Sequence, residues 1–210
     1  MAGIQQVGFT AANVAEVDAN RNAKASEGYP AHPAAGGFYT VCGGPTAVVA
    51  AALATDTSLV SMRLSAGSTR RAFLSKFRFV MTPATLGAAA GVAGQVALQR
   101  ITAAAPSGGT ARTANEQNEP LASATDMTDI RDSNAALTVT SVVFGAEIAR
   151  TVVPLFVSSA GWFEWIYEPI YPTVLTPGDG MVMRTRVALA ATQTWVYSWT
   201  AHWFEGPVIA

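Results

Sequence analysis

Four stretches of the chain alternate between apolar and polar side chains. They cover residues 58–65, 71–81, 181–189 and 194–205. Successive side chains of a β-strand point to opposite faces, so each stretch predicts a strand with one buried face and one polar face. The last stretch is the most aromatic, and its apolar face consists of Trp195, Tyr197, Trp199 and Trp203, opposite Ser198, Thr200 and His202.

Weaker strand signals fill most of the space between these stretches, and the clusters Pro106–Gly109 and Thr176–Gly180 predict turns. Residues 84–97 are expected to be a loop that runs into a strand, because three glycines disfavour a helix there. With almost no amphipathic helix, the pattern predicts an all-β fold over 46–210, an antiparallel two-sheet sandwich of jelly-roll or Greek-key type. The weaker strands are expected at 47–54, 94–102, 126–132, 137–149, 151–158 and 163–168.

Residues 1–45 differ from the rest, since they are rich in Ala, Asn, Gly and Pro and show no strand period. Such a segment buries too little apolar surface to offset the conformational entropy that it would lose on becoming ordered. We therefore expect an extended N-terminal arm that becomes ordered on a partner. Its predicted anchors are the spaced apolar residues Val7, Phe9, Val14, Val17, Tyr29, Phe38, Tyr39 and Val41.

The composition favours a protein that packs against neighbours. Hydrophobic residues make up 50% of the 210 residues, charged residues only 13%, and the net charge is −1. This argues against disorder, which needs high charge, and against nucleic-acid binding, which needs a basic surplus. No secretion signal is predicted, and the charge-free stretch Phe79–Gln99 contains Pro83 and three glycines, which argues against a membrane span.

The chain offers little catalytic chemistry. It has one cysteine, Cys42, and two histidines, His32 and His202, and it lacks the common nucleotide, hydrolase and zinc-protease motifs. We therefore predict no enzymatic activity and no cofactor. The acidic run Asp126, Asp129 and Asp132 has a spacing of three, which does not match a calcium loop, so solvated acids beside a strand are favoured over a metal site.

The segment 161–169 combines two acids with several aromatic residues. Glu164 and Glu168 share one face of a strand, but they are four positions apart, which is about 13 Å along the strand. That is wider than the carboxylate pair of a glycoside hydrolase. Core or interface packing is therefore favoured, with carbohydrate binding as the alternative. The residues that would carry the sugar are Trp162, Trp165 and Tyr167.

Several motifs, in this order, resemble a group of tailed-bacteriophage virion proteins. They are VGFTAANVAEVDAN, ALATDTSLVSMRLS followed by TRRAFLSKFRFVM, SGGT, and TPGDGMVMRT followed by WVYSWTAHWFE. The middle of the chain matches only loosely. The resemblance implies a structural component of a virion, which is assembled in the host cytoplasm.

Within a virion, the predicted β-sandwich, the near-zero net charge, the flexible arm and the missing catalytic groups favour a capsid decoration (cement) protein. Such a protein binds the outside of the major capsid protein shell, usually as a homotrimer. A tail or fibre-base component is an alternative, although the chain has no repeats or heptads of the kind that fibres show. A carbohydrate-binding, lectin-like module is the alternative of another class.

Overall fold

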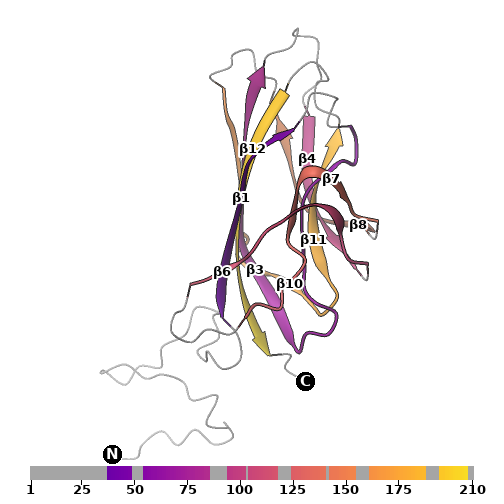
Figure 1. Ribbon diagram of the computed structural model, residues 1–210, viewed down its shortest axis with the longest axis vertical. Coiled ribbons are helices and arrows are strands. Elements are labelled where there is room, and N and C mark those ends of the chain that lie inside the picture. The colour runs from indigo at the N-terminus through magenta and orange to yellow at the C-terminus, as the bar shows by residue number, and fades with distance from the viewer. Residues whose placement is uncertain are drawn as a thin grey trace, which may run out of the picture.

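The protein is a sandwich of two antiparallel β-sheets (Figure 1). The structure is a computed structural model, and it describes residues 37–48, 54–85, 94–102, 104–117, 124–140, 142–154, 161–187 and 194–207. The predicted all-β fold class is therefore confirmed. The strands are β1 (Phe38–Val48), β2 (Ser58–Arg63), β3 (Arg70–Thr85), β4 (Gly94–Ile101), β5 (Ser107–Ala111), β6 (Asn115–Glu116), β7 (Arg131–Thr138), β8 (Val142–Val153), β9 (Phe163–Tyr167), β10 (Thr173–Leu175), β11 (Gly180–Val187) and β12 (Thr194–Pro207).

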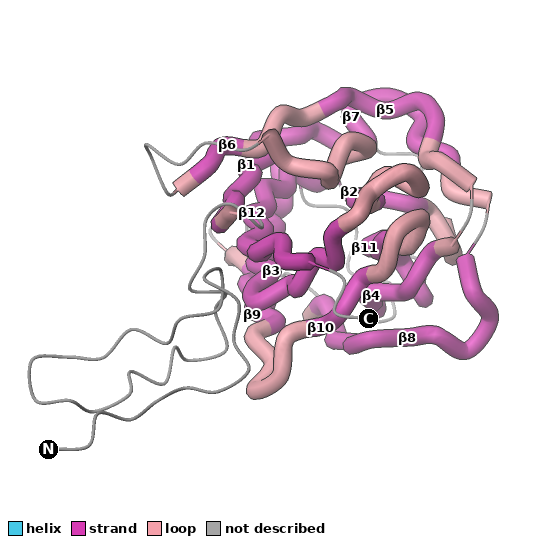
Figure 2. The backbone as a smooth tube through the Cα atoms, turned by 90° about the horizontal axis from the view of Figure 1, so that it is seen from below, coloured by secondary structure: helices cyan, strands magenta, loops and turns pink. Residues whose placement is uncertain are grey.

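The chain crosses repeatedly between the sheets, so neighbours within a sheet are mostly distant in sequence. The first sheet has the order β10-β3-β12-β1-β6, with β9 also paired to β3. The second has the order β5-β7-β2-β11-β4-β8. The two sheets face each other when the molecule is viewed end-on (Figure 2). Such connections between non-adjacent strands are typical of Greek-key sandwiches.

The aromatic face of β12 lies between the sheets, as its alternation predicts. Trp195, Tyr197, Trp199 and Trp203 are each at most 3% exposed. Opposite them on the same sheet, β3 places Phe77 and Phe79 on the inner face. Tyr197 stacks on Phe79 at a ring-centroid distance of 5.4 Å, and Trp199 stacks on Phe77 at 6.1 Å. Aromatic pairs of this kind add to the free energy that burial alone provides.

Two of these aromatic residues also bind the opposite sheet through their polar atoms. The Tyr197 hydroxyl donates to the Leu59 carbonyl at 2.9 Å, and the Ser133 amide donates to that hydroxyl at 3.1 Å. The Trp199 indole N–H donates to Asp132 Oδ2 at 3.3 Å. These bonds satisfy polar groups inside an apolar core and fix one sheet against the other.

The first strand begins inside the segment that the sequence assigned to the arm. Phe38 starts β1, which pairs with β12 along its whole length, and Tyr39 and Val41 are buried in the core. The boundary at residue 45 and the assignment of Phe38, Tyr39 and Val41 as arm anchors are therefore wrong. Tyr39 and Val41 belong to the core, and Phe38 lies half-buried on the outer face of the sheet beside Phe204. The other five anchors lie outside the described residues.

The glycines that suggested an irregular arm instead allow close packing. A Cβ at Gly43 would stand 2.1 Å from Trp199 Nε1 and 2.6 Å from Asp132 Oδ2. Only a residue without a side chain fits at that point of the sheet. The register of β1 on β12 shifts between Gly43 and Thr46, so the strand continues through the glycines as a bulged strand.

Three further boundaries differ from the sequence-based prediction. The cluster predicted as a turn at 106–109 opens strand β5, where Gly108 and Gly109 have positive φ beside a register shift. The strand expected at 126–132 begins only at Arg131, and the strand expected at 137–149 begins at Val142. Residues 86–93 of the predicted loop lie outside the described residues.

Strand β2 was predicted to be half-buried, but both of its faces are buried. Arg63 lies on the face predicted to be polar and is 7% exposed. Its guanidinium donates to the Gly178 carbonyl at 3.1 Å and pairs with Asp129 at 3.3 Å. A buried cation needs such partners, and they come from distant segments that the alternation pattern cannot reveal.

Candidate functional site

Exposed apolar side chains gather along one edge of the first sheet. Among the residues that the structure describes, six large hydrophobic residues are exposed, and five of them lie within residues 162–174. A concentration of exposed apolar side chains in one short segment is typical of a site that another molecule covers. The five are Trp162, Ile166, Ile170, Tyr171 and Val174, and the sixth is Val152 on β8.

The backbone of this edge explains why these side chains point outward. Strands β9 and β10 both pair with β3, β9 with residues 77–81 and β10 with residues 72–74. Ile166 lies opposite Arg78, and Val174 lies opposite Phe73. Both partners are on the outer face of β3, because the alternate positions Phe77 and Leu74 point into the core.

The chain between these two strands forms a protruding loop, residues 168–172, which we call the 168–172 loop. Glu168 pairs with Lys76 at 3.1 Å at one end, and the Tyr167 hydroxyl lies 2.7 Å from Thr173 Oγ1 across the base. Pro169 and Pro172 flank the two exposed residues, and the proline ring fixes φ. These contacts hold the base of the loop, while Ile170 is 92% exposed and Tyr171 85% exposed.

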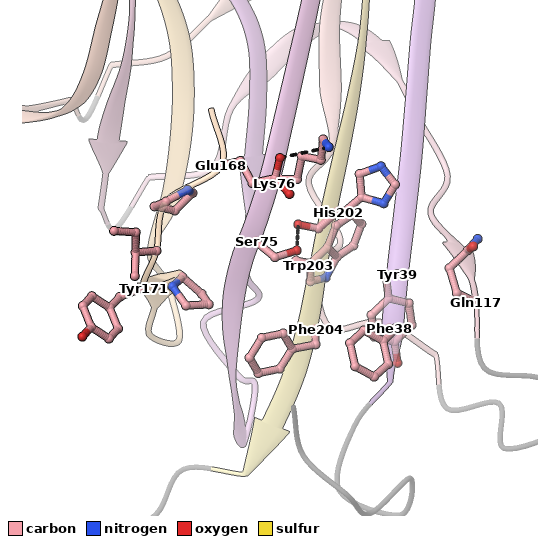
Figure 3. Close-up of a pocket in the computed structure, with 13 residues that line it drawn as sticks. Phe38, Tyr39, Ser75, Lys76, Gln117, Glu168, Tyr171, His202, Trp203 and Phe204 are labelled. Carbon is pink, nitrogen blue, oxygen red and sulfur yellow. Dashed lines mark hydrogen bonds and ion pairs between the residues drawn. The ribbon is translucent and has the colours of Figure 1, made fainter. Parts of the chain in front are cut away.

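A shallow pocket of about 870 Å³ lies beside this loop (Figure 3). It extends over β3, β12 and β1, with Tyr171 at one side and Gln117 at the other. The residues that line it are Phe38, Tyr39, Ser75, Lys76, Gln117, Glu168, Pro169, Ile170, Tyr171, Pro172, His202, Trp203 and Phe204.

The floor of the pocket is aromatic, although it belongs to the outer face of the sheet. Phe204 lies two residues beyond His202 on the outer face of β12 and is 3% exposed. Its ring stacks on Phe73 at a centroid distance of 4.5 Å and contacts Phe38 at 5.9 Å. An outer sheet face is usually polar, so these packed rings form a local aromatic cluster on the outer face beside the edge strands.

Charged residues on the same face form two rows of opposite sign. Lys76 and Arg78 lie on β3, and Glu164 and Glu168 lie on or next to β9. Arg78 pairs with Glu164, and Lys76 pairs with Glu168. Each acid thus has a cationic partner on a neighbouring strand, which favours a structural role over the acid pair of a glycoside hydrolase. The side chains of Arg78 and Glu168 remain at least half exposed.

His202 lies between the basic row and the aromatic floor. Partial burial of the ring and the neighbouring Lys76 cation lower the pKa of His202, and Glu168 offsets part of this. The folded protein therefore binds a proton at His202 less readily than the unfolded chain, whose pKa is about 6.5. The unfolded chain binds more protons, so the stability that His202 confers is lost as the pH falls below that value.

We expect His202→Gln to reduce the loss of stability in mild acid. Between pH 7 and pH 5 the melting temperature should fall less in the variant than in the parent, because the variant has no imidazole to protonate. Thr200→Gln on the same face of β12 is the matched control and should follow the parent. Identical pH profiles for parent and His202→Gln would contradict this role for His202.

The three residues predicted to bind sugar do not form one cluster. Phe163 is in the core, and Trp165 and Tyr167 pack partly buried against it. Trp162 is 59% exposed and has the strand parity of Ile166 on the outer face. Core packing, the favoured prediction for this segment, is therefore confirmed for Phe163.

The three acidic residues at 126–132 form ion pairs and hydrogen bonds within the fold that their spacing did not predict. Asp132 was expected to be solvated but is fully buried, where it pairs with Arg112 at 2.7 Å and accepts the Trp199 bond. Asp129 pairs with Arg63, and Asp126 accepts a bond from Ser68 at 2.6 Å. Within the described ranges, no three His, Cys, Asp or Glu side chains gather closely enough to hold a metal ion.

Sequence analysis missed the most exposed part of this surface. Ile170 and Tyr171 stand between two prolines that connect strands, a place where polar turn residues are usual. Two large apolar residues in such a turn are a signal of an exposed apolar site that the sequence alone provides. Phe204, in contrast, lies on the polar face of a strongly alternating strand, and only its aromatic neighbours in the fold reveal its role.

Comparisons with known proteins assign no function to this chain, so its function is argued from the surface described above. The chain matches no protein-family model, no curated protein and no solved structure. No helix long and apolar enough to cross a membrane occurs among the described residues.

Proposed function

We propose that this chain is a structural component of a tailed-phage virion, a capsid decoration protein that binds the outside of the major capsid shell as a homotrimer. The observation that carries the proposal is the gathering of exposed apolar side chains along residues 162–174. Exposed apolar side chains gathered in this way mark an interaction site, which in this proposal a neighbouring protein covers.

Two further features support a structural role. Charged residues are only 13% of the chain and the net charge is −1, which suits a subunit packed among others better than a dispersed monomer. The order of its motifs resembles that of tailed-phage virion proteins. The carbohydrate-binding alternative is weakened, because Trp162 is separated from Trp165 and Tyr167.

The contact with the capsid is proposed to involve the segment that precedes β1. Residues 1–36 carry Val7, Phe9, Val14, Val17 and Tyr29, which are apolar anchors on a polar, Gly- and Pro-rich segment. Segments of this composition lose conformational entropy when they become ordered on a partner. In a symmetric shell the same weak contact repeats many times, and the repeated contacts add as avidity.

We expect a chain that starts at Gly37 to fold normally but to bind capsids poorly. All strands that the structure describes lie beyond that residue, so its melting temperature should match that of the full chain. Both chains are added to capsids that lack the protein, and binding is measured by co-sedimentation. The full chain should bind and raise the temperature at which the capsids break.

The full-length chain is itself the control for the shortened one. Normal capsid binding by the shortened chain would refute the role of residues 1–36, and the decoration proposal would then rest on the sandwich surface alone. Failure of the full chain to bind any capsid of the phage that encodes it would refute the decoration proposal.

A further inference from the structure

A titratable side chain and an ion pair form one row across the outer face of the first sheet. His202 on β12 lies directly opposite Lys76 on β3, and Lys76 pairs with Glu168 at 3.1 Å. Side chains directly opposite each other on antiparallel strands are about 5 Å apart at their Cβ atoms. Figure 3 shows these three side chains beside the same pocket. A proton on His202 would add a positive charge next to an existing ion pair.

The other groups around His202 supply no second anion. Thr40 on β1 lies opposite His202 on the other side of β12, and Ser75 donates to the His202 carbonyl rather than to the ring. Arg78, two residues along β3, pairs with Glu164. Among the described residues that line the pocket, Glu168 carries the one carboxylate, and the further polar side chains include Gln117 and Tyr171. The nearest charged residue on β12 itself is Glu205, which is buried and pairs with Arg70.

The ion pair of Lys76 with Glu168 holds the 168–172 loop only weakly. The side chain of Lys76 is 36% exposed and that of Glu168 is 61% exposed, and solvent screens ion pairs at such positions. Glu168 is the first residue of the loop that carries the exposed Ile170 and Tyr171. A second cation beside Lys76 is enough to compete for this carboxylate, and its release frees one end of the loop.

We propose that His202 is a proton-operated switch for the 168–172 loop. When the ring is neutral, Glu168 stays paired with Lys76 and holds the base of the loop. When the ring is protonated, the imidazolium repels Lys76 and competes for Glu168, so the ion pair breaks and the base of the loop shifts. Histidine is the side chain whose charge ordinarily changes in mild acid.

The influence of the two charges on His202 agrees with this arrangement. Burial and then the Lys76 cation lower the pKa of His202, whereas Glu168 raises it. Linkage is reciprocal, so a proton on His202 acts on Lys76 and Glu168 with the same free energy with which they act on the proton. The switch does not depend on what covers the loop, and its test is therefore separate from that of the proposed function.

An NMR titration of the full chain between pH 7 and pH 5, with labelled isoleucine methyl groups, tests the switch. The ring of His202 should titrate with a midpoint below about 6.5, and the Ile170 methyl signal should move with the same midpoint. In His202→Gln this movement of the Ile170 signal should be lost. Ile166, which lies opposite Arg78 on the same face, is the internal control, and its signal should stay in place.

Removing either partner of the ion pair should mimic the protonated state at pH 7. In Glu168→Gln and in Lys76→Met, the Ile170 signal at pH 7 should lie close to its position in the parent at pH 5. The His202 midpoint should fall in Glu168→Gln and rise in Lys76→Met, each by about 0.2–0.7 pH unit, as expected for an exposed charge pair. Glu164→Gln breaks the neighbouring exposed pair and is the matched control, which should leave both signals unchanged.

Two results would each overturn the switch. One is an Ile170 signal that does not follow the titration of His202, or that still moves with pH in His202→Gln. The other is a His202 midpoint that neither Lys76→Met nor Glu168→Gln changes.

Discussion

Replacing Trp199 by Ala is expected to lower the free energy of unfolding by about 3–5 kcal/mol, the usual cost of truncating a buried aromatic residue. The side chain is 2% exposed and stacks on Phe77. Its loss opens a cavity between the sheets and also removes the bond from the indole N–H to Asp132. That loss is a large share of the roughly 5–15 kcal/mol that stabilises a typical domain.

Chemical denaturation measures this effect, and Trp162→Ala is its control. Trp162 is 59% exposed, so the same truncation there should change the free energy of unfolding by no more than about 0.5 kcal/mol. Trp199→Phe separates the two contributions, because it keeps most of the apolar contact and removes only the N–H. Equal effects of Trp199→Ala and Trp162→Ala would show that β12 does not form the core.

Glu205→Gln is expected to lower the free energy of unfolding by about 3–5 kcal/mol, the usual cost of removing one partner from a buried ion pair. Glu205 is fully buried on β12, and its carboxylate ties the segment before β7 to the end of that strand. A glutamine would replace one carboxylate oxygen, which accepts hydrogen bonds, with an amide NH₂ group, which can only donate them. It would also leave the Arg70 cation without its anionic partner. The carboxylate accepts bonds from Arg70 Nη1 at 3.5 Å, Thr125 Oγ1, the amides of Asp126 at 2.9 Å and Met127 at 3.3 Å, and Trp203 Nε1 at 3.1 Å.

The matched control makes the same substitution in an exposed ion pair. Glu164 pairs with Arg78 at the surface, where such pairs contribute about 0–1 kcal/mol. Glu164→Gln should therefore barely change the denaturation midpoint, whereas Glu205→Gln should shift it strongly. Amide exchange should also quicken at Asp126 and Met127 in the Glu205 variant. Unchanged exchange and an unchanged midpoint would contradict the anchoring role of Glu205.

The strands with the strongest alternation could be predicted because their signal is local. The aromatic face of β12 and the apolar face of β3 require only that successive side chains point to opposite sides. The structure confirms both faces, with Trp199 and Phe79 each at most 2% exposed. The two-sheet architecture followed, because many strands without amphipathic helices leave few alternatives.

Features that depend on contacts distant in sequence could not be predicted. Gly43 was interpreted as part of an irregular arm, and only the nearby Trp199 indole explains why a glycine stands in a strand. Asp132 was expected to be solvated, but Arg112 and Trp199 bury it. No pattern within a single segment specifies these partners.

The candidate site was missed for a related reason. Its edge depends on β9 and β10 both pairing with β3, and its pocket joins Phe38 to Phe204 across more than half the chain. Sequence reasoning examined residues 161–169 for paired acids and sugar-binding aromatics, whereas the exposed apolar residues continue to Val174. Only the fold brings these residues onto one face.

The copy number of this chain in purified virions of the phage that encodes it tests the central claim most directly. Quantitative mass spectrometry would compare its peptides with those of the major capsid protein. The decoration proposal predicts a number of copies comparable to that of the major capsid protein. A chain present in only a few copies per particle would be a tail or fibre-base component, and a chain absent from the virion would contradict a structural role altogether.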